Sequence, residues 1–443
     1  MFNIIDTEIS SFIEKLRNSG YKIPGYNHNS YENFTPGVTA IYYSGPYFND
    51  KEIIASIRTM LTGKWMSSGG NVTEFEKKFS EHVNQHFSCM TNSGSSANLA
   101  MIAGLKSYFN WQKDDEIIVS VVGFPTTVSV IVQNGLKPVF IDIEEKTLNF
   151  DIEKIEKKIT DKTRAIFLSP VLGNPPDINK LIGICKKYKL FLILDGCDSL
   201  GTKWENKNIQ EYAVASSCSF YASHEICTFE GGMVSSNNRF ILDKVRKIVN
   251  WGRDCTCKGT ENLLPNGSCN HRFDKWLKNY DGIIDHKYVF SEMGYNLKPL
   301  DVCGAVGIEQ LKKLEMICFL RNKTKEIISD FFLKYIDGIR LPKQLKSAQT
   351  TWFGTPVICK DKKQKDALVA YLERNRIQTR NYFSGNILLH PGYEQLDDYK
   401  KYPVANIVYD KVFFMGANPA YTDEVIKYIK YVIKGFNQSY HGK

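Results

Sequence analysis

Short apolar runs alternate with helix-like segments between about residue 87 and residue 235, and this alternation constrains the fold more than any other feature. The strand-like runs cover residues 88–91, 116–121, 138–143, 165–169, 190–194 and 213–219, and the clearest helices cover residues 96–108, 126–134 and 178–188. Such alternation is typical of βαβ units, whose parallel strands form one sheet with helices on both faces. We therefore expect an α/β fold with a mostly parallel sheet and with ligands bound beyond the carboxyl ends of its strands.

The segments on either side predict further elements. Helices are expected near residues 9–16, 50–61, 299–325, 362–375 and 422–434, and strands at 355–359 and 411–414. The sequence also predicts a turn at Pro24-Gly25, a loop at 65–70 and an irregular stretch from 245 to 296. We expect three parts: an N-terminal helical segment (1–50), a large domain that includes a cysteine-bearing loop (51–300), and a small C-terminal α+β domain (301–443).

Composition excludes several classes of protein. Of the 443 residues, 43% are hydrophobic and 24% charged, which is typical of globular chains. The formal charge of +9 comes from lysines spread along the chain, so a nucleic-acid-binding arm is not indicated. The N-terminus lacks the layout of a signal peptide, and no apolar run reaches the ~18 residues of a membrane span. We expect a cytoplasmic protein without a membrane partner, whose eleven cysteines are free thiols or metal ligands rather than disulfides.

Polar and aromatic residues follow the first two expected strands. Gly94, Ser95 and Ser96 open a helix, where backbone amides and hydroxyls favour a phosphate group, although a serine here also serves as an ordinary N-cap. Phe124 follows the second strand and offers a ring that could stack on a planar ligand or pack in the core. Both features are predicted to lie at the same edge of the sheet.

Three more candidates follow later strands. Asp195 ends an apolar strand, where a carboxylate can hold a pyridine nitrogen in its protonated form. Ser219 ends the next strand as a second candidate phosphate ligand, and His224 lies in the loop after it, before a Glu-Gly-Gly that is expected to be flexible. A lone histidine after a strand is usually only a satisfied polar residue. All these positions lie at strand ends and are expected to meet on one face of the sheet, which favours a common site.

Four stretches resemble the nucleotide-sugar aminotransferase and dehydratase family of the aspartate-aminotransferase fold, the fold-type I pyridoxal-phosphate enzymes. The resemblance covers about residues 40–440 and is carried by Gly94-Ser95-Ser96-Ala97-Asn98, Leu194-Asp195-Gly196-Cys197-Asp198, residues 219–232 and Gly294-Tyr295-Asn296-Leu297. It implies a large domain with a seven-stranded, mostly parallel sheet and a small C-terminal α+β domain.

The resemblance also implies roles for individual residues. The serines of turn 94–96 and Ser219 would hold the cofactor phosphate, Asp195 would pair with the pyridine nitrogen, and Phe124 would stack on the ring. Asn296 would reach the phosphate of the neighbouring subunit's cofactor, which implies a homodimer.

His224 stands where enzymes of this kind place the lysine that binds the cofactor, and this substitution resembles the family's 3-dehydratase branch. Without a lysine amine the cofactor works as pyridoxamine 5′-phosphate (PMP), held noncovalently. Its amine can condense with the ketone of a nucleotide-linked 4-keto-6-deoxyhexose. The imidazole of His224 can then take the C4′ proton of the cofactor and protonate the departing C3 hydroxyl. Tyr221 is a candidate for positioning this base or a radical, or simply packs beside the cofactor.

The spacing of four cysteines resembles that of one branch of this family. Fifty-seven residues separate Cys197 from Cys255, and one separates Cys255 from Cys257, as in the [2Fe-2S] motif of the CDP-6-deoxy-L-threo-D-glycero-4-hexulose-3-dehydrase branch. Cys269 would be the fourth ligand, but eleven residues separate it from Cys257, more than the usual seven of that branch. A cluster would carry electrons from a separate NADH-dependent flavin/iron–sulfur reductase. Zinc bound by the last three cysteines and His271 is the alternative.

Residues on the substrate side are expected from similar stretches of the family. These are Trp65, Met66, Phe353 and Arg380, and Arg380 could pair with a diphosphate. The leading hypothesis is a PMP- and [2Fe-2S]-dependent 3-dehydrase of a CDP-linked keto sugar, on the route to 3,6-dideoxyhexoses of surface polysaccharide. Its rivals are a GDP-sugar 3-dehydratase without a cluster that recharges PMP from glutamate, a plain sugar aminotransferase, and a noncatalytic protein that binds zinc or a regulatory partner.

Overall fold

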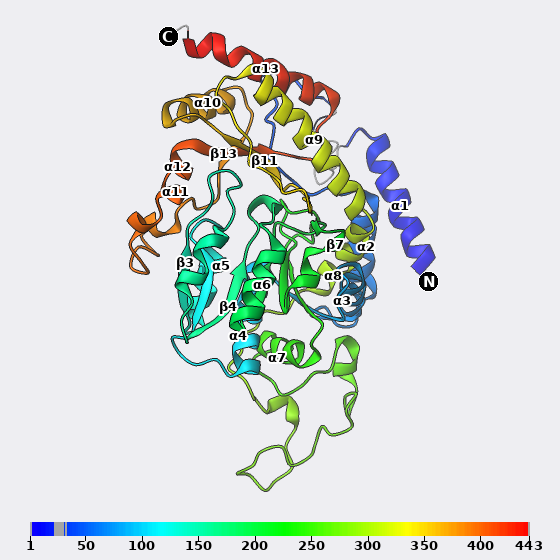
Figure 1. Cartoon of the computed structure of the whole chain (residues 1–443). Coiled ribbons are helices and arrows are strands. Elements are labelled where there is room, and N and C mark those ends of the chain that lie inside the picture. Colours follow the sequence, from blue (N-terminus) through cyan, green and yellow to red (C-terminus); the bar gives the residue numbers. More distant parts are fainter. Residues whose placement is uncertain (1, 22–30, 32, 442–443) are drawn as a thin grey trace.

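A seven-stranded sheet forms the centre of the molecule (Figure 1). The computed structural model describes residues 2–21, 31 and 33–441. In sheet order the strands are β1 (Phe87–Thr91), β9 (Gly232–Ser236), β8 (Ala215–Ser219), β5 (Phe191–Asp195), β4 (Thr163–Leu168), β2 (Glu116–Ser120) and β3 (Lys137–Ile141). Only β9 runs antiparallel to its neighbours, so the expected mostly parallel sheet is confirmed.

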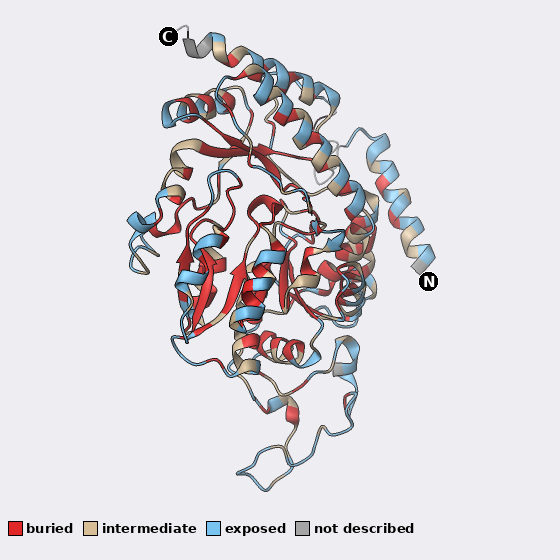
Figure 2. Ribbon diagram, in the orientation of Figure 1, coloured by how far each residue is buried: buried red, intermediate tan, exposed pale blue. Residues whose placement is uncertain are grey.

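Helices cover both faces of the sheet, which is why its strands are buried along nearly their whole length. In β2, Ile117 and Val119 belong to the core that also contains residues of α4 (Gly94–Phe109), α5 (Pro125–Gln133) and α7 (Arg239–Val249). Ile118 points the other way, into the core beneath α6 (Ile178–Tyr188). Figure 2 shows the strands buried and the outer sides of the helices exposed. The strand ends are therefore the open edge at which a ligand can bind.

A second, antiparallel sheet lies in the C-terminal part of the chain. Its strands are β11 (Gly354–Ile358), β13 (Val412–Gly416) and β12 (Thr379–Asn381), and its helices are α9 (Leu314–Tyr335), α10 (Lys362–Arg374), α11 (Pro403–Asn406), α12 (Val408–Lys411) and α13 (Asp423–His441). The core of this part also contains Tyr31 and Ile41 from the N-terminal part. A small three-stranded sheet joins β10 (Ala348–Gln349), β6 (Lys203–Trp204) and β7 (Lys207–Asn208). The domain boundaries at residues 50 and 300 stay predictions.

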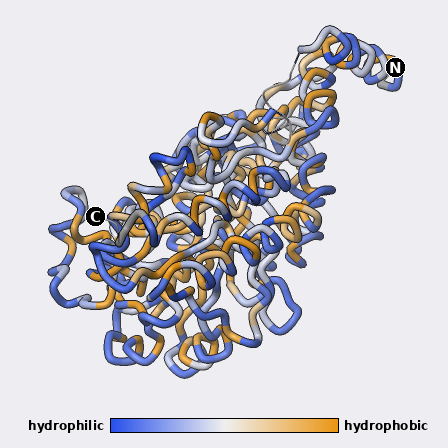
Figure 3. Tube along the Cα trace, turned by 90° about the horizontal axis from the view of Figure 1, so that it is seen from above, coloured by the Kyte–Doolittle hydropathy of each residue, from blue (hydrophilic) through white to orange (hydrophobic). Residues whose placement is uncertain are grey.

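The N-terminal helices lie where the apolar spacing predicts them. α1 (Phe2–Asn18) packs Ile9 and Ile13 against α2 (Asp50–Thr62), and the view from above shows the N-terminal end standing away from the main body (Figure 3). The expected turn at Pro24-Gly25 lies outside the described residues.

Several elements of the structure differ from the prediction. The segment 299–325 is two helices, α8 (Asp301–Leu311) and α9, and helices α3 (Gly70–His82) and α7 have no counterpart in the prediction. Strand β9 is also missing from it, because the Glu-Gly-Gly before β9 suggests flexibility. That suggestion is wrong: Gly232 is buried, and a Cβ added to it would lie 2.3 Å from the carbonyl oxygen of Ser93. Gly232 is therefore needed for close packing, not for mobility.

The cysteine-bearing stretch from 250 to 298 is irregular, as expected, and extends away from the sheet at the bottom of Figure 1. Much of it is exposed (Figure 2). Among the described residues, no helix has the length and apolar character to span a membrane.

Candidate active site

A cavity of about 750 Å³ opens beyond the carboxyl ends of β1, β2, β5 and β8, where the C-terminal sheet faces them. Residues after each of these strands line it, together with residues 353 and 380 from the C-terminal part. The predicted residues that line the cavity are Gly94, Ser95, Phe124, Asp195, Cys197, Ser219, Tyr221, His224, Phe353 and Arg380. The structure thus brings together residues spread over nearly 300 positions of the sequence.

The β1–α4 turn presents the N-terminus of α4 to this cavity. Ser93 is the N-cap: its Oγ accepts a hydrogen bond from the amide of Ser96 at 3.1 Å and donates one to the hydroxyl of Ser96 at 3.0 Å. Ser96 therefore does not line the cavity, whereas Ser95 does. Gly94 is packed so closely that an added Cβ would lie 2.5 Å from the Cβ of Ser219. The amides of α4 and the hydroxyls of Ser95 and Ser219 form a cradle suited to an anion.

Asp195 ends β5, is buried, and is held by four residues. Its Oδ2 accepts hydrogen bonds from Asn98 Nδ2 at 2.9 Å and Thr127 Oγ1 at 2.6 Å, and its Oδ1 accepts from the amide of Cys197 at 3.3 Å. Ser217 donates to Asn98 and, at 3.5 Å, to Asp195. These donors suit an ionised carboxylate, which only accepts hydrogen bonds. The carboxylate is fixed in position at the floor of the cavity.

His224 lies in the loop from β8 to β9. Hydrogen bonds from Phe220 N to Gly231 O at 2.9 Å and from Thr228 N to Phe220 O at 3.0 Å close this loop. The side chain of His224 is only 13% exposed, and its ring centre lies 5.2 Å from that of Phe353. Burial and the nearby charge of Arg321 lower the pKa of His224 to about 3, so the ring is neutral at physiological pH.

Arg321, on α9, anchors the backbone around His224. Its side chain is fully buried and donates hydrogen bonds to the carbonyl oxygens of Ser223 and His224, both at 2.8 Å, and of Phe353 at 3.1 Å. One guanidinium group therefore holds both the histidine loop and the segment that carries Phe353 against the cavity.

Two buried acids lie close to His224. Asp198 Oδ1 is 3.7 Å from His224 Nδ1, and burial, with Glu225 and Asp195 nearby, raises the pKa of Asp198 well above its usual range. Burial raises the pKa of Glu225 to about 7, which Arg321 partly offsets. In the described part of the chain, neither carboxylate oxygen of Glu225 has a hydrogen-bond partner. Two buried carboxyl groups with raised pKa values thus lie close to the histidine.

The mouth of the cavity carries aromatic side chains and one cation. Phe124 and Tyr221 are about half exposed, and Phe124 meets Phe383 edge-on at 6.2 Å between ring centres. The guanidinium of Arg380 lies 4.3 Å from the ring centre of Tyr43. An exposed aromatic face and a cation within one cavity suit a planar ring and an anionic group of a ligand.

The remaining predicted substrate and phosphate residues lie outside this cavity. Trp65 and Met66 are exposed, and Trp65 lines a different cavity of about 240 Å³ together with Trp251 and Lys298. Asn296 is exposed and forms an isolated backbone bridge with Asn250.

The four cysteines differ in their surroundings. Cys197 lines the main cavity, Cys255 is buried in the irregular stretch, Cys257 is partly exposed and Cys269 is exposed. The thiols of Cys255 and Cys257 act on each other's pKa, and the sulfur of Cys257 lies 3.5 Å from the hydroxyl of Ser268. In the part of the chain that the structure describes, no three histidine, cysteine or acidic side chains come together as a metal site.

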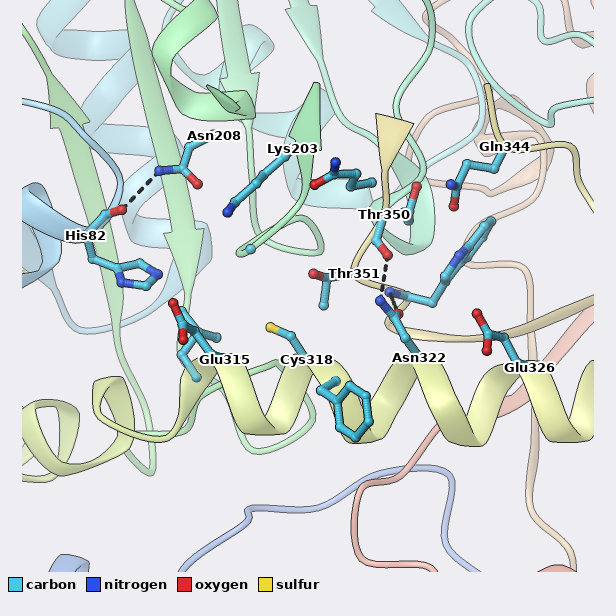
Figure 4. A pocket seen from close by; sticks show the side chains of 15 residues that line it. His82, Lys203, Asn208, Glu315, Cys318, Asn322, Glu326, Gln344, Thr350 and Thr351 are labelled. Carbon is cyan, nitrogen blue, oxygen red and sulfur yellow. Dashed lines mark hydrogen bonds between the residues drawn. The ribbon is translucent and has the colours of Figure 1, made fainter. Parts of the chain in front are cut away.

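Another cavity, of about 520 Å³, lies on the other side of the segment 350–353 (Figure 4). Its wall shows how this segment is held: Asn322 on α9 donates to the carbonyl of Thr350 at 3.0 Å and accepts from the amide of Trp352 at 3.0 Å. Together with Arg321, Asn322 fixes the position from which Phe353 faces the main cavity.

Several residues of the site were not predicted from the sequence. Asn98 and Asp198 lie within two of the four stretches that carry the family resemblance, so their positions could have suggested a role. Glu225 lies within the stretch 219–232 too, whereas Arg321 carried no such signal, because an arginine in a long helix is usually solvated.

Comparisons with known proteins agree with this geometry. Residues 48–434 match the DegT/DnrJ/EryC1/StrS aminotransferase family. The dTDP-4-dehydro-2,6-dideoxy-D-glucose 3-dehydratase of Saccharopolyspora spinosa is 34% identical over 409 residues, 89% of this chain and 86% of the relative. The GDP-4-keto-6-deoxy-D-mannose 3-dehydratase of Yersinia pseudotuberculosis is 31% identical over 399 residues, 87% of this chain and 96% of the relative.

A solved structure has the same architecture. The GDP-4-keto-6-deoxy-D-mannose-3-dehydratase of E. coli, with bound hydrated PLP, superimposes with a TM-score of 0.76 at 28% identity, covering 89% of this chain and 99% of that one. The chain is therefore an enzyme with the fold-type I α/β architecture, and it belongs to the DegT/DnrJ/EryC1/StrS aminotransferase family.

Proposed function

We propose that this enzyme is a PMP-dependent 3-dehydratase of a nucleotide-diphosphate-linked 4-keto-6-deoxyhexose. The observation that carries the proposal is His224, which lies in the cavity that also contains Asp195 and the α4 cradle. No lysine is among the described residues that line this cavity. The cavity therefore offers no side-chain amine for a covalent link between the enzyme and its cofactor. This favours dehydration over amino transfer.

The cavity fits the proposed cofactor, PMP or its aldehyde form PLP. The phosphate would be held by Gly94, Ser95 and Ser219. A glycine is needed at position 94, because a side chain there would fill the cradle. Asp195 would hold the ring nitrogen, and Phe124 would cover one face of the ring. Among the described residues, the buried Nδ1 of His224 has no hydrogen-bond partner, as expected of a group set aside for proton transfer. The solved E. coli relative contains PLP, which supports the same cofactor here.

Bound PMP would supply an amine that condenses with the C4 ketone and a ring that accepts electrons. The neutral imidazole of His224 is in the correct state to take a proton from the C4′ carbon and to return it to the departing C3 hydroxyl. Tyr221 lies three positions before it, where the amide of His224 donates to the carbonyl of Tyr221 at 3.0 Å. We assign Tyr221 to positioning this base. Phe353 covers the histidine ring and limits access of water.

Arg380 and Phe353 are the proposed substrate contacts within the chain's own cavity, with Arg380 pairing with the diphosphate. Trp65, Met66 and Asn296 are exposed and lie outside it. We propose that they act across a homodimer, with Asn296 reaching the cofactor phosphate of the second subunit.

The nucleotide and the source of electrons separate two versions of this function. The cysteine spacing favours a CDP sugar, a [2Fe-2S] cluster on Cys197, Cys255, Cys257 and Cys269, and an NADH-dependent flavin/iron–sulfur reductase. Among the described residues these four cysteines do not come together as a metal site, so the arrangement does not fit a preformed cluster, and no step above passes through one. The second version, a GDP-sugar dehydratase without a cluster, is supported by the Yersinia and E. coli relatives.

The test is incubation of the purified enzyme and PMP with CDP-, GDP- and dTDP-linked 4-keto-6-deoxyhexoses, followed by mass spectrometry. Loss of the C3 oxygen is the expected result. Glutamate and an NADH-driven reductase are supplied in parallel to distinguish the two versions. A 4-amino sugar as the product would instead identify an aminotransferase, and an unchanged substrate in every reaction would indicate a noncatalytic protein.

A further inference from the structure

Three phenylalanine rings in contact with one another form one side of the main cavity. Phe353, Phe383 and Phe414 all line it. The ring centre of Phe383 lies 6.2 Å from that of Phe353 and 5.8 Å from that of Phe414, and the centres of Phe353 and Phe414 are 6.1 Å apart. We call these three residues the phenylalanine wall. Because these rings carry no oxygen or nitrogen, this side of the cavity suits an apolar part of a ligand.

The backbone of Phe383 is strained. Its φ is +47°, in the left-handed region that bulky residues rarely adopt. The turn that contains it is tied to the end of β2: the amide and the hydroxyl of Ser384 both donate to the carbonyl oxygen of Gly123, at 3.2 and 2.6 Å, and the amide of Ile387 donates to that of Val121 at 3.0 Å. Such strain persists only where the surroundings impose it, and it is typical of ligand sites. The fold thus holds the ring of Phe383 in the cavity against the preference of its backbone.

Polar side chains around Phe383 are already bound within the protein. The hydroxyl of Ser384 is taken by Gly123. His390, which also lines the cavity, interacts through Nε2 with the carbonyl oxygen of Ser384 at 2.9 Å and with the hydroxyl of Tyr409 at 2.7 Å. A ligand hydroxyl placed against the phenylalanine wall would therefore lose its water without gaining these groups as partners, which is unfavourable.

The phenylalanine wall borders two groups to which the proposed function gives a role. Phe353 faces the proposed base, with 5.2 Å between its ring centre and that of His224. Phe383 meets Phe124, the proposed cover of the cofactor ring, edge-on at 6.2 Å. A sugar that reaches both the cofactor and His224 therefore lies beside the wall. In a 4-keto-6-deoxyhexose the C2 and C3 substituents are hydroxyls, and the apolar substituent is the C6 methyl group on C5, next to the C4 ketone.

We propose that the phenylalanine wall determines specificity at C6 of the sugar, and that Phe383 is its principal residue. The wall receives the methyl group of a 6-deoxyhexose and disfavours the hydroxymethyl group of an ordinary hexose. This inference rests on the function proposed above and deepens it. The methyl group buries apolar surface against the rings, whereas a C6 hydroxyl would be buried without a partner. An apolar pocket discriminates against one added hydroxyl by about 10²-fold at most.

Binding to the PMP-loaded enzyme tests the wall without turnover. Nucleotide-linked 6-deoxy-D-glucose and D-glucose differ only at C6, and neither has the ketone with which PMP condenses. Isothermal titration calorimetry with both sugars, each as its CDP, GDP and dTDP derivative, measures the preference. The wild type should bind the 6-deoxy sugar about 10- to 100-fold more tightly than the hexose of the same nucleotide. Equal affinities for the two sugars would overturn the proposal.

Variants of Phe383 assign the preference to the wall. Phe383→Gly removes the ring and suits the positive φ, so the turn is kept and the preference should fall to about 1–3-fold. Phe383→Asn also tolerates this φ and offers a hydrogen-bond partner, so it should bind the hexose at least as tightly as the 6-deoxy sugar. Phe383→Leu stays apolar and should retain most of the preference.

Phe240→Ala is the matched control, because Phe240 is 66% exposed on α7, and it should keep the wild-type ratio. An unchanged ratio in Phe383→Gly and Phe383→Asn, with melting temperatures close to that of the wild type, would overturn the proposal. The parallel dehydration assay separates it from the proposed function. A preference for the 6-deoxy sugar without loss of C3 oxygen from any keto sugar would contradict the function and leave the wall. Dehydration without a preference at C6 would do the reverse.

Discussion

The carboxylate of Asp195 and the hydroxyl of Thr127 are joined by a hydrogen bond of 2.6 Å on the floor of the main cavity. Asn98 donates to the same oxygen, so the orientation of this carboxylate is fixed by two side chains from the first two βα units. A carboxylate held in this way can stabilise a positive charge on a ligand nitrogen without having to reorient.

Asp195→Asn should therefore reduce turnover about 10²-fold or more, because a neutral amide cannot stabilise the protonated ring nitrogen of the cofactor. Thr127→Val should cause a smaller loss, since it removes one hydrogen bond worth about 1–3 kcal/mol at a buried acceptor. Steady-state kinetics and absorbance titration with PMP measure both effects. Equal activity of Asp195→Asn and the wild type would contradict the role of Asp195.

His224→Asn should leave PMP affinity nearly unchanged and abolish exchange of the C4′ proton, because the phosphate cradle and Asp195 stay intact while the base is lost. Hydrogen–deuterium exchange at C4′, followed by mass spectrometry, is the measurement. Tyr221→Phe serves as the comparison and should retain most of the exchange, since it keeps the ring beside the cofactor. Exchange that persists in His224→Asn would remove this residue as the base.

Gly94→Ala should destabilise the protein by about 1–3 kcal/mol and weaken cofactor binding. The added methyl group would lie 2.5 Å from the Cβ of Ser219 and 3.1 Å from the sulfur of Cys197. Gly70→Ala is the matched control, because nothing lies within 4 Å of its added Cβ. Thermal unfolding and PMP titration compare the two variants. Similar melting temperatures and PMP affinities would show that the cradle tolerates a side chain.

Glu225→Gln should stabilise the protein at pH 8 but not at pH 5. The pKa of Glu225 is raised to about 7 in the folded state from 4.5, so the favourable contribution of its protonated form is lost as the pH rises through about 7. Such a shift corresponds to at most about 3 kcal/mol. Thermal unfolding at both pH values measures the difference, with Glu8→Gln on the exposed face of α1 as the control. A greater gain in stability at pH 5 would contradict the raised pKa.

Iron and acid-labile sulfide, measured in protein purified without oxygen, test the cluster version of the function. Two of each per chain are expected from a [2Fe-2S] cluster, and Cys255→Ser should lose both together with reductase-dependent turnover while keeping the initial dehydration. Cys318→Ser, at a cysteine outside the predicted set, should retain them. If the wild-type protein contains no iron, the cluster prediction is wrong, and the version of the function without a cluster remains.

Patterns local in the sequence predicted much of this molecule. The period of the apolar residues located six of the seven strands and the helices between them, and turn residues located Gly94, Asp195 and Ser219 at strand ends. The parallel order of the strands then places these residues at one edge of the sheet. Strand β9 was not predicted, because its glycines suggested flexibility. In the structure they allow close packing instead.

Other features depend on contacts between distant parts of the chain. Arg321 binds the carbonyl of His224 from 97 positions away, and Asp142 accepts the amide of Ala405 across 263 positions. Residue type alone also did not separate Ser95, which lines the cavity, from Ser96, whose amide and hydroxyl are bound by the N-cap.

The sequence by itself determined the α/β architecture, the family and the presence of a histidine where a lysine is expected, because strand periodicity and turn chemistry are properties of neighbouring residues. Only the tertiary structure decided how that histidine behaves. Its burial and the guanidinium of Arg321 come from parts of the fold that are far apart in the sequence. Together they set its charge, because the energy of an ionised group depends on its solvation and on the charges packed around it.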